Sequence, residues 1–337
     1  MKARSGSSLP VNRSIVAHDL SCWRAVHCPL WFWHASPVLS LHPFYHRFDG
    51  GERCTRVNRL IDRGRAILSV SIRPLLPRDI PAAIELSTLA GWNQTACDWR
   101  MLLELSPEGC FGIEHEGTLA ATTIVICYGR QLAWLGMVLT HPDYRRRGFA
   151  HRLLEHALEF ADHQNVQSVK LDATEQGQPL YERLGFRVEQ EVQRWSGTGR
   201  NPERIRQPES SAVSEIFAAD REAFGADRSR LLQALAGRKS LAALRQNYLL
   251  WRPGVRAAYI GPCVAADSES ARQLIVRCAD ADETRWFWDL LPANEHAVAL
   301  ATGFGFRVER RLMRMARGAD ARGKDAMIYA IAGFELG

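Results

Sequence analysis

Residues 132–158 read LAWLGMVLTHPDYRRRGFAHRLLEHAL, and no other stretch constrains the fold of this chain as much. An apolar run at residues 132–139 opens it, which is too short for a membrane span and suits a buried strand. Residues 141–143 then predict a turn, because Pro and Asp interrupt the apolar run. Beyond residue 148, apolar residues recur at spacings of three and four, which predicts an amphipathic helix. Its buried face is expected to contain Phe149, Leu153, Leu154, Ala157, Leu158 and Ala161.

The link between this strand and this helix reads Arg145-Arg146-Arg147-Gly148-Phe149-Ala150. Free N–H groups at the start of a helix favour an anion, and the helix dipole adds to that preference. Arginine adds forked donors, and small residues let the backbone approach a ligand closely. The link is therefore either a phosphate-binding turn or an ordinary solvated basic turn between a strand and a helix.

A second segment favours the phosphate-binding alternative. Residues 169–173 predict a short strand, and TEQGQPLYERLGFR at residues 174–187 predicts a short helix that Gly185 ends. Another strand is expected at residues 186–194.

Two motifs in this order resemble the GNAT superfamily of acyl-CoA-dependent N-acetyltransferases. They are Arg145-x-x-Gly148-x-Ala150 after an apolar strand and Leu180-Tyr181-x-x-x-Gly185-Phe186 after the next strand. The resemblance covers residues 70–195 and implies an α/β (α+β) fold with a mixed sheet, in the order β-α-α-β-β-β-α-β-α-β.

The resemblance also implies a place for acetyl-CoA, or another acyl-CoA, as co-substrate. The pantetheine arm is expected along the edge of the central strand, where that strand splays from its neighbour, and Gly136 would permit a bulge there. A backbone N–H of this strand would polarise the acetyl carbonyl. Thr174 stands where the family usually has Asn. The expected contacts are Val138, Leu139, Thr140, Arg145, Arg146, Arg147, Gly148, Phe149, Ala150 and Thr174.

Tyr181 occupies the general-acid position of the family, and its phenol can protonate a leaving thiolate. The alternative is that Tyr181 is only a half-buried helix residue. No general base is assigned. Glu85, Glu104 and Glu114 are candidates, but such glutamates are more often solvated surface residues, and a water chain is the alternative.

The acceptor pocket of the family lies between the first two helices and the central strands. Trp92, Asn93, Trp99, Tyr128 and Trp134 are therefore candidate lining residues, although tryptophans are also common in protein cores. Asn294 and His296 from the second part of the chain could also reach the pocket, and a lone histidine near a helix start is otherwise structural.

The formal net charge of +6 is concentrated in residues 1–69, which hold ten Lys or Arg and four Asp or Glu. The other 268 residues hold 33 of each sign, so no nucleic-acid partner is expected. The sequence has no run of about eighteen apolar residues, and its eight cysteines form no Cys-x-x-Cys pair. We therefore expect a cytoplasmic protein without a membrane partner or a metal site.

The apolar residues within residues 1–69 recur with no sustained period of 2 or 3.6, and we expect a disordered N-terminal extension there. The catalytic domain is predicted at residues 70–196. A polar linker, GTGRNPERIRQPESS, follows at residues 197–211, before a second domain at residues 212–337.

The second domain repeats the first at an offset of 120 residues. Gly305-Phe306-Arg307-Val308-Glu309 matches Gly185-Phe186-Arg187-Val188-Glu189, but Ala301 stands at the position of Tyr181. The loop Asp267-Ser268-Glu269-Ser270 has two acids and no arginine, so it can cap a helix but suits a pyrophosphate poorly. We expect a degenerate GNAT-like domain of the YitH type, which shapes the acceptor pocket or mediates association. Residues 326–334 are predicted to form an apolar strand.

The resemblance therefore implies an acetyl-CoA-dependent N-acetyltransferase in which a primary amine, of a small molecule, attacks the thioester directly. Two alternatives remain at this point. One is a non-catalytic acyl-CoA-binding sensor that regulates a partner, and the other is a protein-lysine acetyltransferase.

Overall fold

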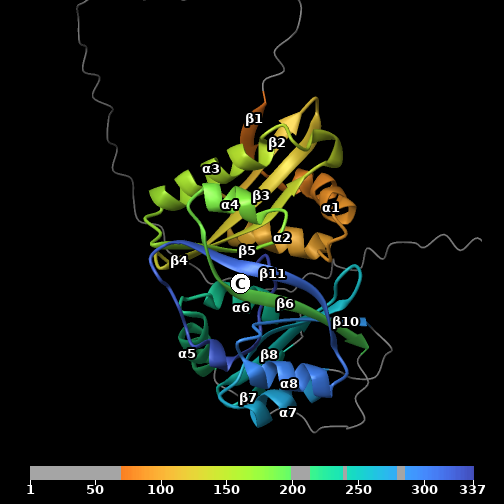
Figure 1. Cartoon of the computed structure of the whole chain (residues 1–337), viewed down its shortest axis with the longest axis vertical. Coiled ribbons are helices and arrows are strands. Elements are labelled where there is room, and N and C mark those ends of the chain that lie inside the picture. Colours follow the sequence, from red (N-terminus) through yellow and green to blue (C-terminus); the bar gives the residue numbers. More distant parts are fainter. Residues whose placement is uncertain (1–69, 199–212, 238–240, 279–284) are drawn as a thin grey trace, which may run out of the picture. The chain divides into compact units, whose positions relative to one another are not determined.

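The computed structural model describes residues 70–198, 213–237, 241–278 and 285–337, all within one compact unit (Figure 1). The predicted extension at residues 1–69 lies outside the described residues. Residues 199–211 of the predicted linker and Ala212 lie outside them as well. We call residues 70–198 the first half and residues 213–337 the second half.

The first half follows the expected order of elements. Two short 3₁₀ turns, Pro77–Asp79 and Pro142–Tyr144, precede α1 and α3. The helices and strands are β1 Ser71–Pro74, α1 Ile80–Leu89, α2 Ala96–Leu105, β2 Cys110–His115, β3 Thr118–Tyr128, β4 Leu132–Thr140, α3 Phe149–His163, β5 Ser168–Ala173, α4 Gln178–Arg183 and β6 Arg187–Thr198.

The second half repeats this alternation in a shorter form. Its elements are α5 Val213–Phe224, α6 Ser229–Ala236, β7 Leu241–Leu244, β8 Asn247–Arg252, β9 Ala258–Val264, α7 Ser268–Cys278, β10 Arg285–Leu290, α8 Glu295–Gly303, β11 Arg307–Gly318 and β12 Ile328–Ala330.

The predicted strand at residues 326–334 was wrong in length, because β12 contains three residues. The N–H of Ile331 donates to the carbonyl of Asp289, and Gly333 takes a left-handed conformation with φ of 127°. Residues 331–337 therefore leave the ladder and turn towards β4.

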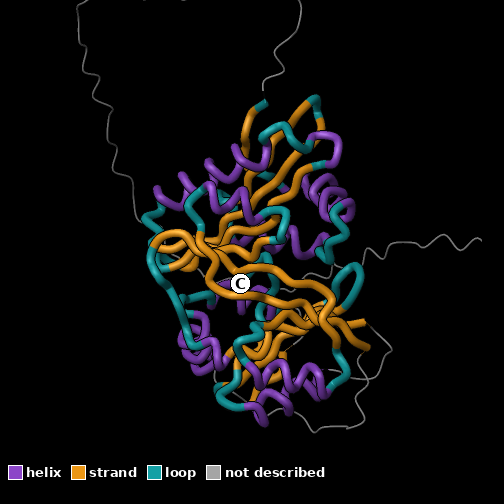
Figure 2. Tube along the Cα trace, viewed as in Figure 1, coloured by secondary structure: helices purple, strands orange, loops and turns teal. Residues whose placement is uncertain are grey.

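The two halves exchange their corresponding strands within one sheet. The strand order is β1-β2-β3-β4-β5-β11-β6-β10-β9-β8-β7, with β12 paired to β9. β11 of the second half thus lies between β5 and β6, and β6 of the first half pairs with β10 (Figures 1 and 2). Each half is completed by a strand from the other.

This pairing corrects the predicted end of β6. A strand was expected at residues 186–194 and a linker from residue 197, but β6 continues to Thr198. Gly197 and Thr198 pair with Trp286 and Arg285 of β10, so they belong to the sheet and not to a linker.

Two large apolar clusters cover opposite faces of β4. Trp134 belongs to the cluster that includes α1, α2, α5 and α6, whereas Ala133 and Leu135 belong to the cluster that includes α3. This alternation follows from the period of two in a strand. All six residues predicted for the buried face of α3 are buried, which confirms that prediction.

The start of α2 shows why its helix begins where it does. Thr95 accepts a hydrogen bond from the N–H of Asp98, and Asp98 accepts one from the N–H of Thr95. This capping box satisfies two N–H groups that would otherwise lack a partner, and Trp99 and Leu102 on the next turn are fully buried.

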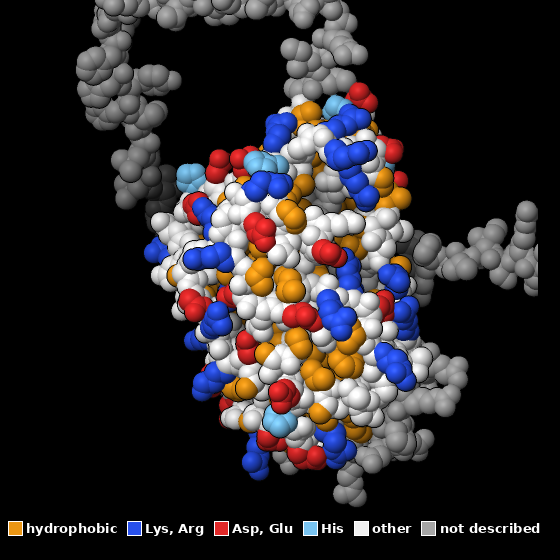
Figure 3. Space-filling view, in the orientation of Figure 1, with side chains coloured by type: hydrophobic (Ala, Val, Ile, Leu, Met, Phe, Trp, Pro, Cys, Tyr) orange, Lys and Arg blue, Asp and Glu red, His pale blue; other side chains and the backbone are white. Residues whose placement is uncertain are grey.

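The surface carries both signs of charge. On the face shown in Figure 3, acidic and basic side chains are interspersed and apolar groups appear between them. Among the residues that the structure describes, no helix is long and apolar enough to cross a membrane.

Candidate active site

β4 separates from β5 partway along its length. The two strands pair in parallel only over residues 132–134 of β4, so the edge beyond them has no strand partner among the described residues. Against β3, the register of β4 shifts between Gly136 and Leu139, which leaves an extra residue on β4. Met137 is left-handed at this bulge, and the Thr122 hydroxyl donates to its carbonyl at 2.9 Å. The predicted splay is confirmed.

The arginine turn presents free backbone donors. Arg146 and Gly148 have left-handed conformations, with φ of 62° and 77°. Glycine at position 148 takes this conformation without the steric cost that a side chain would add. Within the described parts of the chain, no backbone N–H of residues 146–151 donates a hydrogen bond. α3 begins at Phe149, so these groups lie at the positive end of its dipole. The turn can therefore surround an anion with N–H groups.

The side chains of the turn differ in their surroundings. The Arg147 guanidinium lies 5.1 Å from the centre of the Tyr144 ring and donates to the Asp143 carbonyl. Arg145 Nε is 3.4 Å from the Thr140 carbonyl oxygen. Phe149 is buried in the core, so only its backbone is available to a ligand.

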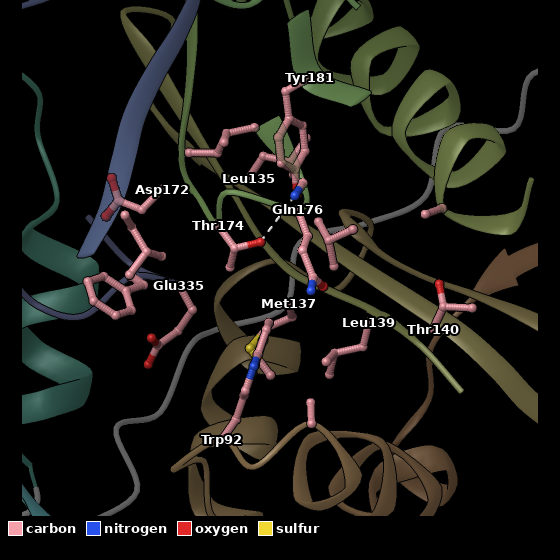
Figure 4. Close-up of a pocket in the computed structure, with 18 of the residues that line it drawn as sticks. Trp92, Leu135, Met137, Leu139, Thr140, Asp172, Thr174, Gln176, Tyr181 and Glu335 are labelled. Carbon is pink, nitrogen blue, oxygen red and sulfur yellow. Dashed lines mark hydrogen bonds between the residues drawn. The ribbon is translucent and has the colours of Figure 1, made fainter. Parts of the chain in front are cut away.

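A cavity of about 470 Å³ adjoins the splayed edge of β4. Tyr181 and Trp92 lie on opposite sides of it, with Asp172 and Glu335 on a third side (Figure 4). Six of the predicted cofactor contacts line it: Val138, Leu139, Thr140, Arg145, Ala150 and Thr174. Arg146, Arg147 and Gly148 are exposed on the turn beside it.

Tyr181 projects into this cavity from α4. Its ring lies against Gly177, where an added Cβ would be 3.0 Å from the ring. Within the described residues its hydroxyl has no hydrogen-bond partner. Burial raises the pKa of Tyr181 above its ordinary value, so the phenol stays protonated and can donate.

Thr174 lines the same cavity, but its hydroxyl already accepts a hydrogen bond from the N–H of Gly177 at 3.2 Å (Figure 4). Its side chain therefore helps to position the loop that precedes α4.

Two buried carboxylates reach the cavity, and the sequence patterns did not single them out. Asp172 on β5 accepts hydrogen bonds from Arg314 on both oxygens, at 2.9 and 3.1 Å. Glu335 accepts from Arg252 at 3.0 Å, and burial raises the pKa of its carboxyl group above the ordinary value. The sequence does carry a signal for them, which is a single acidic residue within an apolar segment, as in VKLDA at residues 169–173 and IAGFELG at residues 331–337.

The predicted acceptor residues divide into two groups. Trp92 and Asn93 line the cavity. The other three lie outside its lining: Trp99 donates to the Ser87 hydroxyl, Tyr128 to the Leu336 carbonyl and Trp134 to the Phe334 carbonyl. These three side chains are buried in the core between the halves.

Asn93 is held by the second half. Its Nδ2 donates to the Ala257 carbonyl at 2.9 Å, and its Oδ1 accepts from the N–H groups of Arg256 and Ala257. This amide therefore fixes the cavity wall to residues that are more than 160 positions away in the chain.

The earlier candidates for a base do not line the cavity. Glu85 and Glu104 are exposed, and Glu114 forms an ion pair with Arg73. Asn294 accepts a hydrogen bond at the start of α8, and His296 is exposed beside it, so neither reaches the cavity. Among the described residues, no group of His, Cys, Asp or Glu is placed to hold a metal ion.

The corresponding opening in the second half is filled. β9 pairs with β10 over Ala258–Ile260, and β12 then pairs with β9 at Val264 and Cys263. At the start of α7, Asp267 accepts from the N–H of Ser270. This carboxylate confirms the predicted cap and occupies the place that an anion would need.

Comparison with known proteins agrees with this architecture. Residues 80–186 match the model of the Acetyltransferase (GNAT) family, and residues 216–330 match that of an Acetyltransferase (GNAT) domain. Together the two matches span more than half of the chain. The chain belongs to the GNAT acetyltransferases, as a two-domain, acyl-CoA-dependent N-acetyltransferase.

Individual proteins are similar to this chain over much of its length. The chain is 27% identical over 214 residues to YitH of Bacillus subtilis, an uncharacterized N-acetyltransferase, covering 59% of this chain and 74% of YitH. A provisionally assigned acetyltransferase from Pyrococcus horikoshii superposes with a TM-score of 0.73 at 22% identity, covering 83% of this chain and all of that one. A tandem GNAT protein from the clavulanic acid biosynthesis pathway superposes with a TM-score of 0.53 at 12% identity, covering 74% and 98%.

Proposed function

We propose that this enzyme transfers an acetyl group from acetyl-CoA to the primary amine of a small molecule, by direct attack on the thioester. One observation carries the proposal: the unpaired edge of β4, the turn with free N–H groups and the Tyr181 hydroxyl all adjoin one cavity. The pantetheine arm would lie along that edge, and the pyrophosphate would lie on the turn.

The chemistry divides between two side chains. The amine nitrogen forms a bond to the acetyl carbon, the C–S bond breaks, and its electron pair goes to sulfur. Tyr181, as general acid, gives its proton to the leaving thiolate. Glu335 takes the proton that the nitrogen must lose, directly or through a water molecule.

Glu335 suits this role better than Asp172. Arg314 occupies both oxygens of Asp172, whereas Arg252 donates only to Oε1 of Glu335. The backbone of Glu335 also lies against Gly136, next to the bulge where a strand N–H would polarise the acetyl carbonyl.

We assign the cofactor to the first half alone. Its turn carries three arginines and free N–H groups, whereas the turn before α7 carries acids and is capped by Asp267. The opening beside β9 is also occupied by β12. The second half would therefore shape the acceptor side of the cavity.

Thermal unfolding with and without saturating acetyl-CoA or CoA tests the cofactor assignment. A ligand at a hundred times its Kd adds about 2.7 kcal/mol. At about 2–4 °C per kcal/mol for a domain of this size, the Tm should rise by about 5–10 °C. The double variant Arg146→Glu with Gly148→Glu should lose the shift, and Glu269→Gln at the corresponding turn of the second half should keep it. No shift with the unaltered protein would reject the proposal.

Release of free thiol in the presence of an amine panel tests the reaction itself. Thiol release that depends on the amine supports acetyl transfer. A Tm shift without thiol release from any amine would instead favour the non-catalytic acyl-CoA sensor.

A further inference from the structure

Three buried arginines pair with carboxylates at hydrogen-bond distance, and in each pair one member lines the cavity. Arg194 is paired with Asp289, Arg252 with Glu335, and Arg314 with Asp172. Each pair is buried, as the cost of placing an isolated charge in a protein interior requires. None of these guanidinium groups is left for a ligand.

Arg310 differs from these three. It lines the cavity from β11, it is half-buried, and it lies opposite Arg194 in the pairing of β11 with β6. Among the residues that the structure describes, it makes no hydrogen bond or ion pair. Burial and the positive charge of Arg194 both lower the pKa of Arg310, so its charge is disfavoured in the unliganded cavity. Because a guanidinium remains protonated in proteins, an anion there would relieve both costs.

A second polar group in the wall lacks a partner. Gln94 is 8% exposed and lines the same cavity, and its Oε1 is buried with no hydrogen bond among the described residues. Buried side-chain oxygens nearly always have a partner. A ligand with hydrogen-bond donors would supply one.

The rest of the wall limits what that ligand can be. Trp92, Leu312 and Phe334 provide apolar surface for a carbon skeleton. Glu335 is paired with Arg252 through Oε1, and its other carboxylate oxygen receives no hydrogen bond from Arg252. It can therefore accept from an amine in the cavity that also holds the cationic Arg310. A molecule that carries both an amine and a carboxylate group matches these two side chains.

We infer that the acceptor is a free amino acid, whose carboxylate binds Arg310 while its amine faces Glu335 and the acetyl group. This inference rests on the proposed function and adds the class of acceptor. It also gives the second half a role, since Arg310, Leu312 and Glu335 all come from it.

Matched pairs of acceptors test the inference. Phenylalanine is compared with phenethylamine, and leucine with 3-methylbutylamine, by thiol release from acetyl-CoA. The unaltered enzyme should prefer each amino acid over its decarboxylated partner by at least about tenfold in kcat/KM, since an unpaired charged group in a site discriminates strongly. Arg310→Met should lower kcat/KM for the amino acids about tenfold to a hundredfold, mainly through KM, and leave the plain amines unchanged. Arg310→Lys should recover part of the loss.

Arg311→Met is the matched control. Arg311 is the next residue of β11, its side chain is 64% exposed, and it is paired with Glu191 outside the cavity. This variant should retain the preference of the unaltered enzyme. A retained acetyl-CoA shift in Tm shows that the Arg310 variants are folded.

The failures of the two proposals can be told apart. Equal turnover of amino acids and plain amines, with no effect of Arg310→Met, would overturn the amino-acid inference and leave acetyl transfer intact. If neither amino acids nor plain amines are acetylated, the amino-acid inference is overturned as well. The loss of the acetyl-CoA shift in the unaltered protein would instead show that the cofactor assignment itself is wrong.

Discussion

The carbonyl oxygen of Glu335 lies directly against Gly136, so that a Cβ on residue 136 would be 2.8 Å from it. No real Cβ tolerates such a distance to a backbone atom. Glycine at position 136 therefore lets residues 331–337 approach the central strand and bring the Glu335 carboxylate to the cavity.

Gly136→Ala should destabilise the protein and reduce activity together. Either the strand or the Glu335 backbone must move, and overpacking of this kind costs about 1–3 kcal/mol. Urea unfolding and thiol release measure the two effects. Gly303→Ala is the control, because nothing lies within 4 Å of a Cβ there, and its stability should stay the same or rise slightly. Unchanged stability in Gly136→Ala would contradict the close contact.

Tyr181→Phe should lower kcat by about 10²- to 10⁴-fold, which is the usual contribution of general acid catalysis. The acetyl-CoA shift in Tm should remain, because the phenyl ring keeps its packing against Gly177. Equal kcat in the two proteins would leave Tyr181 with a packing role only.

The raised pKa of Tyr181 also predicts how stability responds to alkaline pH. The folded state keeps the phenol protonated, while the unfolded chain ionises near pH 10, so the contribution of the neutral phenol is complete below pH 10. It is lost as pH rises from 10 towards the folded pKa. The difference in free energy of unfolding between the unaltered protein and Tyr181→Phe should be constant from pH 7 to 9. Above that range, the unaltered protein should lose stability relative to Tyr181→Phe. Urea unfolding at pH 8, 9, 10 and 10.5 measures this change, and a constant difference throughout would argue against a raised pKa.

Glu335→Gln should lower kcat by about 10²-fold or more if this carboxylate accepts the proton of the amine. The amide is similar in shape, so the acetyl-CoA shift should persist. Glu85→Gln, at an exposed position of α1, should have no effect on kcat. An active Glu335→Gln enzyme would return the role of base to water.

Neighbouring residues on α5 should differ sharply in their contributions to stability. Asp220 is 1% exposed, accepts hydrogen bonds from the buried Arg228 at 2.9–3.2 Å, and also accepts one from the Tyr248 hydroxyl. Asp220→Ala leaves the guanidinium buried without its carboxylate and should cost about 3–5 kcal/mol.

Arg221→Ala is the natural comparison, because Arg221 and its partner Asp227 are both exposed. Loss of this surface pair should cost about 1 kcal/mol or less. Denaturant unfolding of both variants tests the contrast, and similar losses would show that the Asp220 network is not a buried ion pair in solution.

Local pattern predicted the part of the site that is local in sequence. The strand, turn and helix from β4 to α3 follow from apolar spacing, and Gly148 and Tyr181 were identified because each belongs to a short motif. The assignments of Tyr181 and of the arginine turn to catalysis and cofactor binding remain predictions.

The acceptor side was harder to predict because it is assembled from distant segments. Trp99 and Trp134 are close in the sequence to residues that line the cavity, yet both side chains pack into the core. Glu335 and Arg310 reach the cavity only because β11 and residues 331–337 fold back onto the first half. The closely similar segments that begin β6 and β11 also give no local indication of which neighbours each strand pairs with.

The exchange of β6 and β11 has a consequence for how the protein is made. During synthesis β5 leaves the ribosome more than a hundred residues before β11, its partner in the finished sheet. Until then, the unpaired edge of β5 is exposed to other nascent chains, and such edges promote aggregation. The half that carries the candidate site therefore cannot complete its own sheet during translation, and it must wait for the last long strand of the other half.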